Sequence, residues 1–230
     1  MAFNGYNAGS GNSLMSSATL AHGIGSGDFA VAGWVYRVLG YSSTFLYMNG
    51  SLGSTFAVQV ADGALGRFAV WCAGTYRFDS TVPTGAWTHL AVVRRSGLIY
   101  GYVNGVQEAT TITNSISLGT DYQYVAGREY VADLALWSEG PSAAEIAALA
   151  KWRRPPAVRL SGLKAYWGFQ REIVDRWSSG LVMNTQNGAA SYVDHPPMIE
   201  ELMPFVDMPF GVADSVVGSA GVSLGLGLGM

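Results

Sequence analysis

The sequence predicts an all-β protein, an antiparallel sandwich of two sheets with one short helix and an extended C-terminal arm. Short segments in which apolar and polar residues alternate predict strands, because successive side chains of a strand point to opposite faces. Glycine-rich turns separate these segments at the spacing typical of a sandwich. Residues 29–135 contain no stretch with the 3.6-residue period of a long helix, which favours sheets throughout this region.

The clearest strand signal lies in two neighbouring segments, residues 87–94 and 98–103. Asn104-Gly105 follows the second segment, and both residues tolerate the positive φ angles of a type I′ hairpin turn. The same reasoning predicts other strands at residues 14–20, 29–38, 44–48, 55–60, 67–72, 109–116, 121–127, 130–136 and 163–169.

One helix is predicted between the last two of these strands. Ser142 and Glu145 have the spacing of a capping box, in which each side chain bonds to the other residue's backbone N–H. Pro155-Pro156 is expected to stop the helix. Three apolar residues would form one stripe along it: Ile146, Leu149 and Trp152.

Taken together, these motifs resemble the laminin-G-like (concanavalin A-like) jelly-roll family. The pattern W-x-H-x-A-V…Y-x-N-G in residues 87–105 carries most of the resemblance, and the other matching segments follow in family order: residues 28–35, 132–138 with 142–146, and 163–167. The resemblance implies a jelly-roll sandwich over residues 1–194. Pro196-Pro197 marks a boundary, and residues 195–230 are predicted to form an extended arm because proline removes the backbone donors that a central strand needs. Asp194-His195-Pro196-Pro197 resembles the form found in virion proteins of tailed bacteriophages.

Composition favours burial in an assembly. Hydrophobic residues make up 49% of the chain and charged residues only 13%, about half the usual share. With a net charge of −3, the chain is not expected to bind nucleic acid or an anionic membrane through electrostatic attraction. No signal peptide and no apolar run of membrane-spanning length is visible. We therefore expect synthesis in a host cytoplasm and a location in the virion, with no nucleic-acid or membrane partner.

The arm is the predicted partner-binding site. Its pattern Met-Pro-Phe occurs twice, and its last residues alternate leucine with glycine, with no charged side chain after Asp214. Such a segment would bind a neighbouring protein through backbone pairing and alternate side chains. The residues predicted to make these contacts are Met203, Pro204, Phe205, Met208, Pro209, Phe210, Leu224, Leu226 and Leu228.

The sequence predicts no enzyme. Glycoside hydrolases of this fold carry closely spaced carboxylates on one strand, and the nearest candidates here are Glu129 and Asp133. Four residues of extended strand separate them by about 13 Å, whereas the paired carboxyl groups of such enzymes lie about 5 to 9.5 Å apart. Asp133 is therefore expected to bind turn or backbone donors, and no catalytic residue is assigned.

No cofactor or metal ligand is assigned either. His22, His89 and His195 are far apart in sequence, and His89 is expected to be a structural residue with its hydrogen bonds satisfied. Cys72 is the single cysteine and is predicted to be a small buried apolar residue. Calcium is a weak alternative, with three aspartates as candidate loop ligands: Asp28, Asp62 and Asp121.

Two functions remain open. The first is a non-enzymatic virion structural protein, either capsid decoration or tail-associated, that associates with copies of itself and with other virion proteins. The alternative is a carbohydrate-binding adhesion module that recognises host-surface glycans through aromatic side chains, since sugar rings stack on such rings. The aromatic residues considered for this role are Tyr100, Tyr102, Tyr122, Tyr124 and Tyr130.

Overall fold

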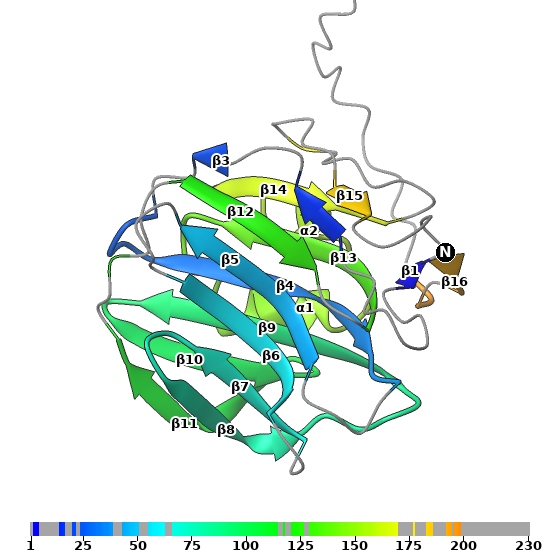
Figure 1. Ribbon diagram of the computed structural model, residues 1–230, viewed down its shortest axis with the longest axis horizontal. Coiled ribbons are helices and arrows are strands. Elements are labelled where there is room, and N and C mark those ends of the chain that lie inside the picture. The colour runs from blue at the N-terminus through cyan, green and yellow to red at the C-terminus, as the bar shows by residue number, and fades with distance from the viewer. Residues whose placement is uncertain are drawn as a thin grey trace, which may run out of the picture.

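The protein folds into two antiparallel sheets packed face to face, which confirms the predicted all-β sandwich (Figure 1). The computed structural model describes residues 2–4, 14–16, 20–21, 24–38, 43–50, 55–62, 66–114, 117, 121–126, 129–169, 177, 183–185, 192–194 and 196–198.

Sheet A runs in the order β11 (Val106–Thr113), β10 (Leu98–Val103), β9 (Trp87–Arg95), β4 (Phe29–Tyr36), β13 (Tyr130–Trp137), β1 (Ala2–Asn4) and β16 (Tyr192–Val193), with β14 (Leu163–Trp167) also paired to β13. Sheet B runs in the order β15 (Met183–Thr185), β2 (Leu14–Ser16), β12 (Asp121–Ala126), β5 (Ser43–Gly50), β6 (Thr55–Asp62), β7 (Arg67–Trp71) and β8 (Thr75–Thr81), with β3 (Leu20–Ala21) paired to β12.

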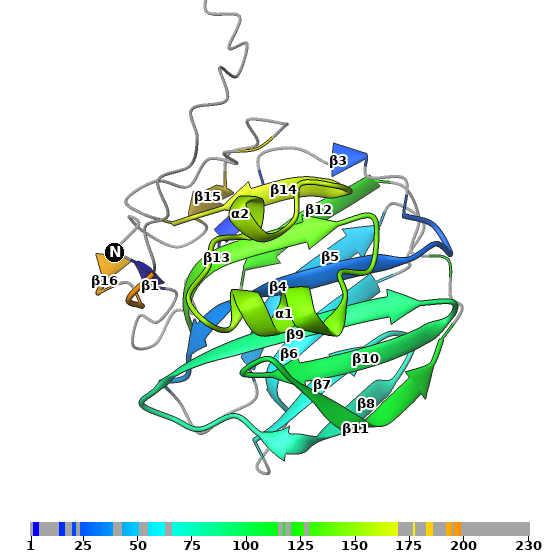
Figure 2. The same cartoon turned by 180° about the vertical axis from the view of Figure 1, so that it is seen from behind.

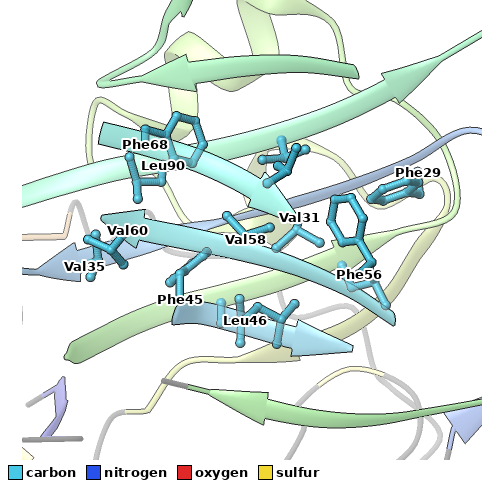
Figure 3. Packing of buried hydrophobic residues seen from close by; sticks show 14 of the residues in the cluster. Phe29, Val31, Val35, Phe45, Leu46, Phe56, Val58, Val60, Phe68 and Leu90 are labelled. Carbon is cyan, nitrogen blue, oxygen red and sulfur yellow. The ribbon is translucent and has the colours of Figure 1, made fainter. Parts of the chain in front are cut away.

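The main core fills the space between the two sheets (Figure 3). Every second residue of β4, β6 and β7 points inward, as the alternation in the sequence predicts. Burying these side chains supplies the main driving force for folding, at about 25 cal/mol per Å² of apolar surface. The inward residues include Phe29, Val31, Val35, Phe45, Leu46, Phe56, Val58, Val60, Phe68 and Leu90.

Two short helices, α1 (Ala143–Leu149) and α2 (Pro155–Val158), lie against the outer face of sheet A (Figure 2). Ile146 and Leu149 are buried there with Trp137 of β13. The predicted capping box is confirmed, because Ser142 Oγ accepts from the Glu145 N–H and Glu145 accepts from the Ser142 N–H. The helices therefore leave only the outer face of sheet B without a described helix over it.

The region after α1 differs from the prediction of one helix ended by two prolines. Leu149 ends α1, and Pro155-Pro156 begins α2, where a missing N–H is harmless in the first turn. Trp152 lies outside both helices at φ 67°, and its ring stacks on Trp34 of β4. Trp152 thus packs against the body, but as a residue of the turn and not of a helical stripe.

Several short strands had no sequence signal. β8 has an exposed, polar pattern, while β1, β15 and β16 are two or three residues long. The strand predicted to end at residue 48 continues through Asn49 and Gly50, which pair with β12, while Asn49 also pairs with β6. Pairing with neighbouring strands thus forms these elements where local preference does not.

The hairpin between β10 and β11 has the predicted backbone. Asn104 and Gly105 adopt φ angles of 50° and 80°. Asn104 Oδ1 accepts from the His89 N–H at 2.9 Å, and the Asn104 N–H donates to the His89 carbonyl at 2.8 Å. The turn is therefore fixed to strand β9 as well as to its own strands.

Edge strands of the two sheets are joined through Glu108 on β11. Its buried carboxylate accepts from the backbone N–H groups of Asp79 and Ser80 on β8, at 2.9 and 2.8 Å. Asp79 in turn accepts from the N–H and hydroxyl of Thr110, and these hydrogen bonds lower the pKa of the Asp79 carboxyl. This link closes one side of the sandwich.

At the opposite side of sheet A, the N-terminal β1 pairs with both β13 and β16. Beyond β16, Pro196 is buried and Met198 packs against the cluster of Ala2, Trp34 and Ala132. The predicted boundary at residues 194 and 195 stays a prediction, and the residues assigned to arm contacts, 203–228, lie outside the described residues. In the described part of the chain, neither helix is long and apolar enough to cross a bilayer.

Candidate functional site

The outer face of sheet B carries an aromatic and polar set of side chains. Phe56 and Val58 of β6 and Phe68 and Val70 of β7 point into the core, so the residues between them point outward. Strand pairing aligns the outward residues in two rows: Ala57 with Trp71, and Gln59 with Ala69 and Arg77.

Small residues form the floor of this face. Ala57 and Ala69 are buried although they point outward, because larger side chains of neighbouring residues cover them. Trp71 lies directly opposite Ala57 and is half-buried. Part of the Trp71 side chain therefore stays accessible on this face.

Polar groups stand beside this floor. Arg77 forms an ion pair with Asp62, and their side chains are 49% and 17% exposed. The buried Oε1 atom of Gln59 has no hydrogen-bond partner among the described residues. The face thus offers hydrogen-bond donors and acceptors next to an aromatic ring, the combination that small-molecule sites use to fix orientation.

The two carboxylates considered for catalysis have structural roles, Glu129 directly before β13 and Asp133 within it. Glu129 accepts from the Val38 N–H at 2.7 Å and is buried. Asp133 accepts from the hydroxyl of Tyr166 and adopts φ 48° where the register of β13 and β4 shifts. Asp133 was expected to bind backbone or turn donors, and the hydroxyl of a tyrosine on β14 is one of its donors.

His89 is buried against Trp34, with 5.2 Å between ring centroids. Among the described residues its buried Nδ1 atom has no hydrogen-bond partner, so within this part of the chain the expectation of a fully satisfied histidine is wrong in that detail. Burial lowers the pKa of His89 to about 3, because the charged imidazolium would lose its solvation. The ring is therefore neutral near pH 7. His22 and His195 lie outside the described residues.

Cys72 is buried, as predicted, and its Sγ atom accepts from the Asn114 side-chain amide at 3.0 Å. Burial raises the pKa of this thiol, which disfavours the reactive thiolate. Cys72 is therefore a packing residue.

The aspartates considered for calcium have other partners where they are described. Asp28 accepts from the Ser96 N–H at 2.8 Å, and Asp62 pairs with Arg77. The side chain of Asp121 lies outside the described residues. Across the described residues, no three His, Cys, Asp or Glu side chains come together as a metal site.

The predicted aromatic groups separate in space. Tyr102 is buried beside Ile146 on the outer face of sheet A, with Tyr100 partly buried next to it. Tyr130 stacks on Tyr36 with 5.4 Å between ring centroids. The side chains of Tyr122 and Tyr124 lie outside the described residues. Trp71 was not singled out from the sequence, although its alternation with Phe68 and Val70 marks it as an outward aromatic residue.

Comparisons with known proteins agree with this fold. A family model described as the concanavalin A-like lectin/glucanases superfamily matches residues 8–155. A heptameric SAP-like pentraxin from Limulus polyphemus superposes with a TM-score of 0.53 at 14% identity, covering 65% of this chain and 80% of the pentraxin. A protein of Bacteroides ovatus proposed to bind carbohydrate gives a TM-score of 0.59 at 17% identity, covering 85% of this chain and 60% of that one. A search of curated proteins finds no match.

Proposed function

Because the chain belongs to the concanavalin A-like lectin/glucanases superfamily, we propose that it is a non-catalytic carbohydrate-binding module. The binding surface in this proposal is the outer face of sheet B. The observation that carries it is the half-buried Trp71 ring above a floor of Ala57 and Ala69, beside the Arg77–Asp62 pair.

The chemistry of this face fits a sugar. The apolar C–H face of a pyranose ring stacks on an aromatic ring, and sugar hydroxyls exchange hydrogen bonds with amide, guanidinium and carboxylate groups. Arg77 and Asp62 neutralise each other, so this pair favours a neutral sugar over a strongly charged one. The proposed ligand is therefore a neutral glycan on a host surface.

A binding role without turnover agrees with the carboxylates of this face. Glycoside hydrolysis needs two carboxyl groups on either side of the scissile bond. On this side of sheet B, Asp62 is engaged by Arg77, and Asp79, two residues beyond Arg77 on β8, accepts from Thr110. Glu129 and Asp133 are on sheet A and bind Val38 and Tyr166.

A glycan array with the full chain tests the proposal. Trp71→Ala is expected to weaken binding about tenfold, since an aromatic contact contributes roughly 0.5–1.5 kcal/mol beyond its area. Tyr76→Ala is the matched control: it removes an exposed ring from β8 at the position paired with the inward-facing Val70. No glycan binding by the wild type, or equal binding by the Trp71 variant, would overturn the proposal.

A second candidate is a structural protein of a virion, either capsid decoration or tail-associated. The apolar C-terminal sequence favours this role, because Met203–Phe210 and the leucine–glycine end carry almost no charge in a chain that is itself only 13% charged. Purified particles should then contain many copies of the chain. Removal of residues 199–230 should reduce that copy number while leaving the sandwich folded by circular dichroism; unchanged incorporation would contradict this role.

A further inference from the structure

Five aromatic rings lie together on the outer face of sheet A, beyond the end of α1. We call this set the outer aromatic strip: Trp34, Tyr36, Trp87, Tyr130 and Trp152. Strand register places Trp87, Tyr36 and Tyr130 side by side on β9, β4 and β13. Tyr36 contacts Trp87 edge-on at 5.7 Å and stacks on Tyr130 at 5.4 Å between ring centroids.

The strip is only partly covered by the described chain. Trp34 is buried under Trp152, whose ring is parallel to it at 3.7 Å, but four rings of the strip remain half-buried: Tyr36, Trp87, Tyr130 and Trp152. A row of accessible rings on three adjacent strands is the kind of surface that anchors apolar side chains of a partner.

The C-terminal part of the chain reaches this same surface. Val193 and Met198 pack in the cluster that contains Trp34, Trp87 and Trp152. Residues 199–230 follow directly, so the arm starts beside the strip. The start of the arm and the outer aromatic strip therefore lie on the same face of the molecule.

The sequence of the arm matches the chemistry of the strip. Met203-Pro204-Phe205 and Met208-Pro209-Phe210 offer methionine sulfur, which contacts ring edges favourably, and phenylalanine and proline rings, which pack on aromatic faces. The strip includes no charged side chain, and Asp207 is the single charge among residues 203–210.

Charge complementarity extends this match toward Trp152. Glu200-Glu201 precedes the first Met-Pro-Phe, whereas exposed Lys151 and Arg153 adjoin Trp152 in sequence. Arg154, two residues beyond Trp152, has a buried Nε–H donor without an acceptor in the described structure. A carboxylate arriving with the arm would supply the acceptor that this buried donor lacks.

Prolines favour a second copy as the source of the arm. Pro196, Pro197 and Pro204 each fix φ near −65° and hold the preceding residue extended, which disfavours a tight reversal onto the chain's own strip. Because the start of the arm and the strip share one face, two copies can exchange arms about a twofold axis, each burying both elements.

We propose that the outer aromatic strip is the docking site for residues Met203–Phe210 of a second copy of this chain. This inference rests on the virion-assembly candidate and is independent of glycan binding by sheet B. Each sandwich body then binds the arm of the other copy. The result is a closed, arm-exchanged dimer that serves as the assembling unit.

Light scattering of the full chain after size exclusion tests the proposal. The wild type should be a dimer at micromolar concentration, and both Phe205→Ser/Phe210→Ser and Tyr36→Ser/Tyr130→Ser should weaken the dimer at least tenfold. Val106→Ser and Leu160→Ser, which change exposed apolar residues outside the strip, are matched controls expected to leave the dimer intact.

Mixing the two defective proteins gives the decisive measurement. The arm variant keeps an intact strip, and the strip variant keeps an intact arm. A one-to-one heterodimer with a single exchanged arm should therefore form more readily than either variant's own dimer. Dimers unaffected by both double variants, absence of the heterodimer, or a monomer whose arm is protected from protease by its own strip would each overturn the proposal. Glycan binding by the same variants, measured on the array, tests the sheet B site independently. The dimerisation proposal can therefore fail while the glycan-binding proposal stands, and the reverse.

Discussion

At the scale of single residues, buried polar groups govern how the protein responds to pH. His89 is neutral because burial lowers its pKa to about 3, against 6.5 in an unfolded chain. Its described neighbours, Trp34 and Asn104, carry no titratable group. As pH falls below 6.5 the unfolded state takes up a proton that the folded state refuses, so folding stability falls with pH.

Lowering the pH should therefore destabilise the wild type already at pH values above those at which carboxylates titrate. Between pH 7 and 5 the free energy of unfolding should drop by about 2 kcal/mol, at 1.36 kcal/mol per pH unit below 6.5. The lowered pKa values of Asp79 and Glu139 act in the same direction, but only below about pH 4. Urea unfolding of wild type and His89→Gln at both pH values measures this, and an equal drop in the two proteins would contradict it.

At the scale of elements, glycines with positive φ set the two hairpins of the central region. Gly97 and Gly105 have nearly the same φ, 76° and 80°, but different surroundings. A Cβ atom at Gly97 would meet nothing within 4 Å, whereas one at Gly105 would lie 2.9 Å from the Cα of Ala147 in α1. The β10–β11 turn thus also serves as the surface on which α1 packs.

Substituting these glycines separates backbone strain from loss of packing. Gly97→Ala should cost about 1 kcal/mol, the strain of an L side chain at positive φ. Gly105→Ala should cost about 2–4 kcal/mol, since α1 must also move away from a methyl group. Thermal unfolding of the two variants gives the comparison; similar losses would mean that the contact with α1 contributes little.

At the scale of the whole molecule, side-chain hydrogen bonds at the described edge of the sandwich join one sheet to the other. Glu108 is one of them, linking β11 of sheet A to the backbone of β8 in sheet B. Its carboxylate accepts from two backbone N–H groups at this edge. The closed edge keeps β7 and β8, and with them Trp71 and Arg77, aligned over the core.

Removing this link should loosen the sandwich. Glu108→Ala should cost about 2–4 kcal/mol, because the carboxylate accepts two charge-assisted hydrogen bonds. Both N–H groups donate to the Oε2 atom of Glu108, so the amide oxygen of Glu108→Gln can accept from both without the negative charge, and this variant should cost about half as much. Denaturant unfolding, together with hydrogen exchange of the Asp79 and Ser80 amides, checks this, and unchanged protection of those amides in Glu108→Ala would show that the link is dispensable.

Local sequence patterns determined much of this protein by themselves. Alternation decided that Phe68 and Val70 face the core and that Trp71 faces out, and the Asn104-Gly105 and Ser142–Glu145 patterns fixed a turn and a helix start. These features depend on residues within one turn or one strand, so the residues of a single segment are enough to determine them.

Only the tertiary structure decided which outward residues become neighbours. Trp87, Tyr36 and Tyr130 are far apart in sequence, and the register of β9, β4 and β13 alone brings them into one row. The same holds for Trp152 stacking on Trp34, and for Gln59, Ala69 and Arg77 on sheet B. Strand order and register arise from packing between distant segments, and both proposed binding surfaces exist only through that non-local pairing.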